Sequence, residues 1–341
     1  MGTQQARPVT LRTIADQLGL HVSTVSRVLH AKPDESLRAA SADTVERVRR
    51  LADELGYQPN PHATSLRTRR SNLVGVLVPR LSDIVLATIY EGIEEAAAEQ
   101  GLSTFVANTG DRPEAQRSRT NMVIGRRVDG MIFGDAHADG RFLAEVAGRG
   151  IPFVLVSRTC GDHPSVTCDD YLGGRLVADH LLELGHRDVA VVAGEPYAST
   201  GIDRTAGLVD RYREAGLPIP PHRIARSRFD VSGGHAATAR LLDTPEPPTA
   251  VFAVNDFAAI GAIGALRDRG LRAGADVAVV GFNDTPLAAE LPLPLTTVRS
   301  PMLEMGRRGL RLLSRLLEGE PVESERLRPE LVVRASSAPR R

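Results

Sequence analysis

The chain has 341 residues, 42% of them hydrophobic, and its 42 Lys and Arg residues balance its 42 Asp and Glu residues. This length exceeds that of one small helical module and predicts two or three domains with a sizeable buried core. No apolar run is as long as a membrane span, and the first eight residues lack the apolar stretch of a secretory signal, so we expect a cytoplasmic protein without a membrane partner. The two cysteines, Cys160 and Cys168, show no metal or redox spacing, which fits a reducing compartment.

Charge is unevenly distributed along the chain. Residues 1–72 hold 11 Lys and Arg against 7 Asp and Glu, whereas the remainder holds 31 against 35. A basic head on an acidic body is typical of a DNA-binding module joined to a body that need not touch DNA. The charge pattern therefore favours nucleic acid as a partner of the N-terminal part.

Residues 11–29 predict a helix-turn-helix, because two short helical patterns flank Gly19, which can take the positive φ of a sharp turn. The apolar residues expected to face inward are Ile14, Ala15, Leu18, Leu20, Val25, Val28 and Leu29. The opposite arc is shared by Val22, Ser23, Ser26 and Arg27. Its side chains are short except for the arginine, so the arc can approach the floor of a major groove. Taken alone, the arc also fits an ordinary solvated helix face.

A third helix is expected over residues 41–55, with Ser41 as its N-cap and Gly56 as its stop. The following segment, 57–70, contains a short helical pattern with Pro61 in its first turn, an apolar Leu66 and a basic cluster. From the residues alone, we expect Leu66 to pack on the rest of the protein.

From residue 72 onward, short apolar runs alternate with amphipathic stretches, which predicts parallel sheets covered by helices on both faces. The expected strands are 73–78, 104–107, 130–133, 154–156, 189–192, 251–253 and 277–280. The expected helices are 86–100, 113–126, 141–149, 172–184, 202–215, 232–242 and 257–269.

Six motifs extend this interpretation: Thr24–Leu29, Glu54–Tyr57 with Pro59 and Asn60, Leu184–Arg187, Asn255 with Asp256, Val280–Asp284, and Pro294–Val298. Together they resemble the lactose-repressor (LacI/GalR) family of bacterial transcription regulators, and the resemblance runs from about residue 9 to residue 335. It implies an α-helical helix-turn-helix headpiece and an α/β ligand domain with two lobes of the periplasmic-binding-protein type. It also implies crossover strands that return a final helix, about 301–318, to the first lobe.

The implied domains are a headpiece (1–58), a hinge helix or linker (59–71), an effector-binding and dimerisation domain (72–335) and a tail (336–341). In the headpiece, the resemblance implies that Val22, Ser23 and Arg27 face base edges of double-stranded operator DNA. In the hinge, it implies that Leu66 wedges into the minor groove and that Arg67 contacts phosphate. His21 stands where the family usually has a serine cap, so we expect a frayed helix start or a phosphate contact there.

The effector residues implied by the resemblance are Asp169, Arg204, Phe229, Asn255 and Asn283. Asp169 is expected either to cap the following helix or to reach the cleft. Asn283 replaces the aspartate usual in the family, and the sequence 83–86 lacks the usual aromatic pair, so the effector (a sugar or another metabolite) stays open.

An enzyme is not expected, because the chain lacks a dinucleotide-binding glycine motif, a P-loop and a nucleophile elbow. Residues 135–139 are similar to a metal cluster, but we prefer a solvated loop. A solute-binding protein without DNA function is the alternative, since 72–335 alone would fit it. We therefore predict a homodimeric transcriptional repressor, with no metal and no cofactor, whose operator affinity is controlled by a small-molecule effector.

Overall fold

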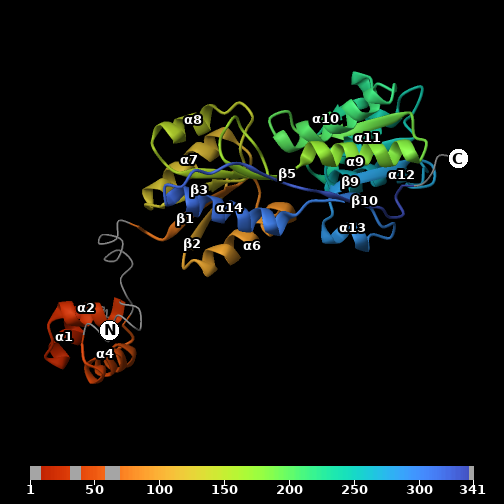
Figure 1. The fold of residues 1–341 in the computed structure, drawn as a ribbon. Coiled ribbons are helices and arrows are strands. Elements are labelled where there is room, and N and C mark those ends of the chain that lie inside the picture. The colour runs from red at the N-terminus through yellow and green to blue at the C-terminus, as the bar shows by residue number, and fades with distance from the viewer. Residues whose placement is uncertain (1–8, 31–39, 58–69, 338–341) are drawn as a thin grey trace, which may run out of the picture. The chain divides into compact units, whose positions relative to one another are not determined.

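The computed structural model describes residues 9–30, 40–57 and 70–337, and it divides between Ser71 and Asn72 into two compact units, each with its own core (Figure 1). The hinge residues Leu66 and Arg67 lie outside the described residues. None of the helices in the described ranges is both long and apolar enough to cross a bilayer.

In the described part of the first unit, the helices are α1 (Leu11–Leu18), α2 (Val22–His30) and α4 (Ala42–Glu54). The side chain of Thr10 caps α1 by accepting from the backbone N–H of Thr13, and Gly19 ends it with φ +63°. Ser41 caps α4 through the backbone N–H of Thr44. The predicted cap at Ser41 and the predicted turn at Gly19 are therefore confirmed, because each depends only on residues within one turn of the helix end.

All three helices contribute to the core of this unit. Its buried members are Ile14, Ala15, Val25, Val28, Val45, Val48 and Ala52. Leu18, Leu20 and Leu29 pack around them, half-buried. Since α2 buries Val25 and Val28, its opposite arc stays at the surface.

In the second unit, the first lobe has a six-stranded sheet in the order β11-β5-β4-β3-β1-β2, in which every pair is parallel. Its strands are β1 (Leu73–Val78), β2 (Ser103–Asn108), β3 (Gly130–Phe133), β4 (Phe153–Val156), β5 (Ser165–Cys168) and β11 (Glu325–Leu327). Its helices are α6 (Ile84–Glu99), α7 (Pro113–Gly125), α8 (Arg141–Gly148) and α14 (Met302–Leu317).

The second lobe repeats this plan with the order β12-β10-β9-β8-β6-β7, and only β12 runs antiparallel to its neighbour. Its strands are β6 (Val189–Ala193), β7 (Ile224–Arg226), β8 (Ala250–Ala253), β9 (Ala278–Asn283), β10 (Thr296–Arg299) and β12 (Glu330–Val332). Its helices are α9 (Asp170–Glu183), α10 (Ser199–Glu214), η1 (Pro221–Arg223), α11 (Val231–Leu242), α12 (Asp256–Arg267) and α13 (Pro286–Glu290).

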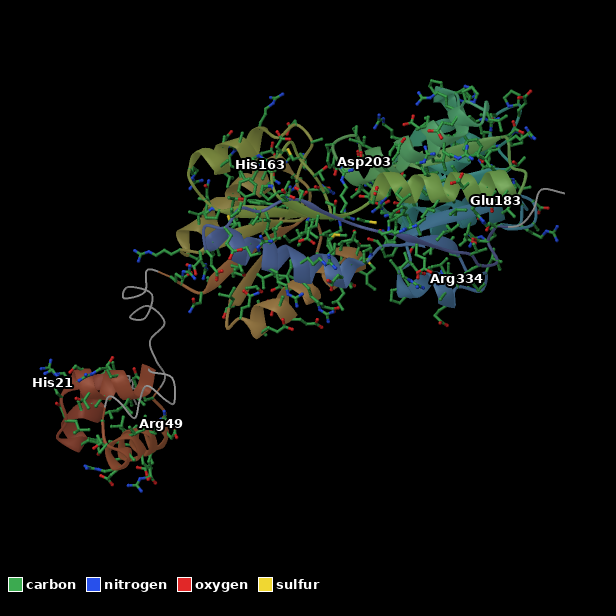
Figure 2. The ribbon with its side chains drawn as sticks, in the orientation of Figure 1. His21, Arg49, His163, Glu183, Asp203 and Arg334 are labelled. Carbon is green, nitrogen blue, oxygen red and sulfur yellow. The ribbon has the colours of Figure 1, made fainter. Side chains whose placement is uncertain are left out.

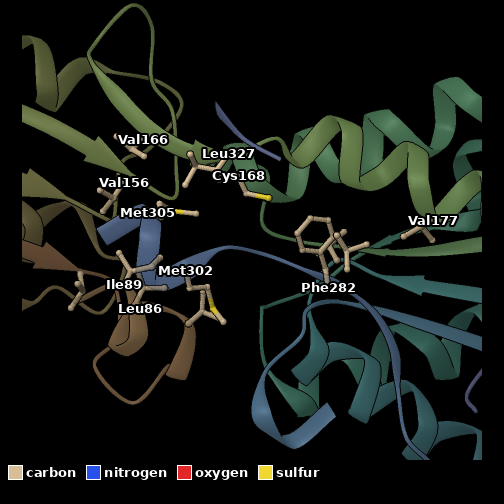
Figure 3. Packing of buried hydrophobic residues seen from close by; sticks show 14 of the residues in the cluster. Leu86, Ile89, Val156, Val166, Cys168, Val177, Phe282, Met302, Met305 and Leu327 are labelled. Carbon is tan, nitrogen blue, oxygen red and sulfur yellow. The ribbon is translucent and has the colours of Figure 1, made fainter. Parts of the chain in front are cut away.

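The chain passes between the lobes three times, after β5, after β10 and after β11. The last helix, α14, packs on α6 of the first lobe, as expected. A Cβ atom added at Gly306 would lie 1.9 Å from the carbonyl oxygen of Ile89, so the two helices meet at backbone contact. Figure 3 shows Ile89 and Met305 from these helices in the buried cluster that also contains Val156 and Phe282.

The C-terminal residues Ser336 and Ser337, which we placed in the tail, are buried in the second lobe. The hydroxyl of Ser336 donates to the carbonyl oxygen of Val279 at 2.6 Å and accepts from the backbone N–H of Thr296 at 2.8 Å. The hydroxyl of Ser337 lies 2.8 Å from Nε2 of His180. These two serines therefore belong to the packed body of the lobe.

Candidate functional site

The outer arc of α2 carries the residues predicted to face DNA. Val22, Ser23 and Arg27 are exposed, and Ser26 is half-buried. Nε of Arg27 donates to the backbone oxygen of Ser23 at 3.3 Å, one helical turn away. One nitrogen of the Arg27 guanidinium is therefore held against the helix backbone, while the side chain as a whole stays at the surface, where it can reach a base edge.

The start of α2 differs from the expected frayed end. Nδ1 of His21 accepts from the backbone N–H of Ser23 at 3.3 Å and lies 2.7 Å from the hydroxyl of Ser23. The imidazole, labelled in Figure 2, thus supplies the capping acceptor that a serine usually supplies. The same contact holds the side chain of Ser23 against His21.

A cavity of about 790 Å³ lies between the two lobes of the second unit. It is lined by loops that follow the carboxyl ends of strands in both sheets, where ligands of open α/β folds bind. Arg204, Phe229, Asn255 and Asn283 line it. Asp169 is absent from the lining and caps α9 by accepting from the backbone N–H of Leu172 at 3.0 Å, so the structure shows the cap of its two expected roles.

Arg204 forms one wall of the cavity and is itself buried. Its Nε donates to Oδ1 of Asp170 at 2.7 Å, its Nη1 donates to the carbonyl oxygen of Val254 at 2.7 Å, and its guanidinium lies 3.7 Å from the ring centroid of Phe282. Burial raises the pKa of Asp170 to about 6, although the neighbouring Arg204 acts in the opposite direction. The arginine is therefore held by three fixed partners before any ligand binds.

Asn255 positions its neighbours with both ends of its amide. Its oxygen accepts from the backbone N–H of Ala258 at 2.9 Å, which caps α12, and its nitrogen donates to the backbone oxygen of Phe229 at 3.0 Å. The ring of Phe229 covers Gly194 so closely that a Cβ atom there would lie 2.2 Å from it. Asn255 thus fixes the segment that carries the aromatic ring of the cavity.

Behind the cavity, Asp256 is the centre of a buried network. Its carboxylate accepts from the hydroxyl of Thr297 at 2.5 Å, from the backbone N–H of Thr285 at 2.7 Å and from the hydroxyl of Thr285 at 2.9 Å. Burial raises the pKa of Asp256 to about 6 despite these donors.

Four side chains link the lobes across one end of the cavity, and we call them the interlobe bridge: Asp111, His137, Arg158 and Tyr197. Both terminal nitrogens of Arg158 donate to the carboxylate of Asp111 at 2.8 Å, and the hydroxyl of Tyr197 from the second lobe donates to it at 3.2 Å. The ring of His137 stacks on that of Tyr197 with centroids 4.3 Å apart. Burial alone would raise the pKa of Asp111, but the hydrogen bonds from Arg158 and His137 hold it well below its usual range.

None of these four residues was assigned to the site from the sequence. Asp111 and Arg158 follow β2 and β4, so their place after strand ends was the available signal. Residues 135–139 form a loop, as expected, with Ala138 and Asp139 exposed to solvent, but Asp135 and Ala136 are buried. Among the described residues, no three His, Cys, Asp or Glu side chains are grouped to hold a metal ion.

Two family descriptions match the chain. Residues 10–60 match "Bacterial regulatory proteins, lacI family", and residues 178–337 match "Periplasmic binding protein-like domain". The HTH-type transcriptional regulator DegA of Bacillus subtilis (strain 168) is 33% identical over 337 residues, which cover 97% of this chain and 98% of DegA.

Solved structures agree with this result. The lac repressor dimer bound to operator and the anti-inducer ONPF is 29% identical with a TM-score of 0.86, and the match covers 97% of this chain and 100% of that one. The complex of the transcriptional regulator CelR with cellobiose is 32% identical with a TM-score of 0.73, with the same coverage. Because these relatives match both units, they support a regulator over a solute-binding protein. The chain belongs to the LacI family of bacterial regulatory proteins and is a DNA-binding transcriptional regulator.

Proposed function

We propose that the protein is a cytoplasmic repressor that binds a two-fold operator as a homodimer and changes its operator affinity when a small effector occupies the interlobe cavity. The exposed arc of α2 is the observation that carries the DNA-binding part, with Val22, Ser23, Ser26 and Arg27 as the reading residues. Leu66 and Arg67 are proposed as the minor-groove and phosphate contacts of the hinge. Two-fold symmetry of the dimer requires two-fold symmetry of the site.

The proposed effector is a neutral compound rich in hydroxyl groups, such as a sugar or nucleoside. Three of the four arginines that line the cavity already face a carboxylate: Arg158 faces Asp111, Arg204 faces Asp170 and Arg228 faces Asp230. The site therefore offers little net positive field to select a phosphate or a dicarboxylate. Asn283 adds a neutral amide to the cavity lining, and an amide can bond a hydroxyl group in either direction.

Two experiments test this function. Full-length protein is expected to select a preferred sequence from randomised duplexes and to be retained on DNA in a salt-dependent manner, whereas a chain that begins at Asn72 is not retained. A thermal-shift panel of neutral sugars, including cellobiose, and nucleosides is compared with their phosphate esters. Stabilisation by esters alone would contradict the proposed effector class, and absence of any sequence preference would contradict the repressor.

Replacement of Arg27 by alanine is expected to weaken binding to the preferred sequence by about 1–3 kcal/mol and to relax the preference at one base pair. The physical reason is the loss of a bidentate donor at a base edge. Binding titrations and a repeat of the sequence selection measure both effects. Arg47→Ala is the matched control, because it removes the same charge from the outer side of α4. An unchanged sequence preference in Arg27→Ala would remove this residue from the reading set.

Replacement of Tyr197 by phenylalanine removes one hydrogen bond to a charged carboxylate across the cleft. The equilibrium constant between bridged and separated lobes is therefore expected to shift about fivefold toward the separated arrangement. Distance distributions between spin labels on α8 and α11 measure this shift. Tyr171→Phe is the control, since the hydroxyl of Tyr171 donates to Asp210 within the second lobe. Identical distributions in wild type and Tyr197→Phe would show that the interlobe bridge does not hold the lobes.

A further inference from the structure

The turn at the carboxyl end of β9, formed by the last strand residue Asn283 and the next residue Asp284, has an unusual backbone. Asn283 has φ +115° and Asp284 has φ +54°, and no other two consecutive non-glycine residues in the described ranges both have positive φ. The value at Asp284 lies in the left-handed region that aspartate tolerates. The value at Asn283 lies outside it, where a side chain is strained. This turn therefore stores strain at a residue that lines the cavity.

Asn283 carries a second unfavourable feature. It is 4% exposed, and its Oδ1 has no hydrogen-bond partner among the described residues. A buried carbonyl oxygen without a donor destabilises the folded state in addition to the backbone strain. Strain of this kind persists only where surrounding groups determine the conformation.

Ion pairs from two other segments meet at Asp284, whose side chain is 7% exposed. Nη2 of Arg334 donates to Oδ1 at 2.7 Å, and Nε of Arg299 donates to Oδ2 at 2.8 Å. Nη1 of Arg334, which Figure 2 labels, also donates to the carbonyl oxygen of Leu295 at 2.8 Å. The carboxylate of Asp284 is thus held from both sides by residues outside its own loop.

Hydrogen bonds fix the residues on either side of Asp284. The backbone N–H of Ser300 donates to the carbonyl oxygen of Asn283 at 3.3 Å. Thr285 is held by Asp256 through both its backbone N–H and its hydroxyl. With these ends fixed, the side-chain pairs of Asp284 decide the conformation of the strained turn.

We propose that Asp284, clamped by Arg299 and Arg334, is a positioning residue that keeps Asn283 in its strained conformation, with its amide group in the lining of the effector cavity. The effector contact in this proposal rests on the function proposed above, whereas the strain and the clamp do not. The clamp stabilises the turn, and the strain is retained because this conformation places the Asn283 side chain in the cavity wall, where an effector can contact it.

A double-mutant cycle tests the clamp without any ligand, using full-length protein and thermal unfolding. Asn283→Gly removes the strain and the unpaired oxygen, so it is expected to raise the Tm by roughly 2–4 °C in the wild type. In an Asp284→Asn background, where the turn has relaxed, the same change is expected to give little or no increase. Arg299→Met, at an exposed arginine, provides a milder second background with an intermediate result. Equal Tm increases in all backgrounds, or a decrease in the wild type, would overturn the proposal.

A binding measurement tests the link to the cavity. For a neutral sugar or nucleoside that stabilises the wild type, Asp284→Asn is expected to weaken binding about tenfold, because the Asn283 amide no longer keeps its position in the cavity wall. Asp243→Asn is the matched control, since it breaks an ion pair to Arg269 elsewhere on the second lobe. Unchanged affinity in Asp284→Asn would overturn the positioning role. If no compound stabilises the wild type, the proposed effector class fails, and the unfolding cycle still decides the clamp.

Discussion

Replacement of Arg204 by methionine is expected to lower the free energy of unfolding by about 3–5 kcal/mol and to abolish the effector response. Methionine preserves much of the apolar stem and removes the guanidinium that lies over Phe282, so the loss comes from the charged head. The side chains of Arg204 and Asp170 are 6% and 5% exposed, and removal of the arginine leaves the carboxyl group and the carbonyl oxygen of Val254 buried without their donor. Chemical denaturation at pH 7.5 measures the change.

The same two helices provide a control. Arg211 of α10 donates to Asp179 of α9 at 2.5 Å, but these side chains are 29% and 44% exposed. Arg211→Met is expected to cost no more than about 1 kcal/mol, because water replaces the lost partner. Arg204→Met combined with Asp170→Asn is expected to recover part of the stability by removing the unpaired acid. Equal losses for Arg204→Met and Arg211→Met would contradict the role of burial.

The second large effect is a dependence of stability on pH that comes from Asp256. Its folded pKa of about 6 lies above the ordinary aspartate value of 3.8, so the folded state holds its proton more tightly than the unfolded chain does. Its contribution to stability is therefore fully present below about pH 4 and is lost as the pH rises through 6. A rise of about two in the pKa of Asp256 corresponds to a contribution of about 3 kcal/mol to the free energy of unfolding.

The comparison of wild type with Asp256→Asn isolates this contribution from those of other acids. Asparagine does not titrate, so the stability of the wild type relative to the variant is expected to fall between pH 4.5 and 7. Urea unfolding at several pH values measures it. Asp243→Asn, which removes a carboxyl group at the surface, serves as the control substitution. A flat difference between wild type and Asp256→Asn would contradict the raised pKa.

Helix ends and long strands were predictable because their signals are local. The cap at Ser41, the turn at Gly19 and the bounds of β1 and β3 depend on residues that are neighbours in the chain. The strands β7, β11 and β12 have three residues each, too few to show a period. Their strand character comes from pairing with distant segments, as when Glu325 of β11 pairs with Val166 of β5.

The residues of the candidate site likewise include some that the sequence predicts and some that it does not. Arg204, Asn255 and Asn283 were expected from motifs that resemble the family, and all three line the cavity. The interlobe bridge was not expected, because Asp111 meets residues 47 and 86 positions away and no local pattern marks such a meeting. His21 shows the opposite case. Histidine is not a preferred helix cap, yet a ring nitrogen of His21 accepts a hydrogen bond from the backbone N–H of Ser23 and caps α2.

The three passages of the chain between the lobes have a consequence for biosynthesis. The first lobe, although it begins at Leu73, is completed only when the ribosome has made α14 and β11, so Ile89 and Val156 lack their covering helix until then. The second lobe closes later still, when Ser336 bonds to Val279. A stop codon between Arg328 and Ser336 would therefore damage the second lobe after the first is complete, whereas one before β11 would damage both, and an affinity tag is best attached beyond Ser337.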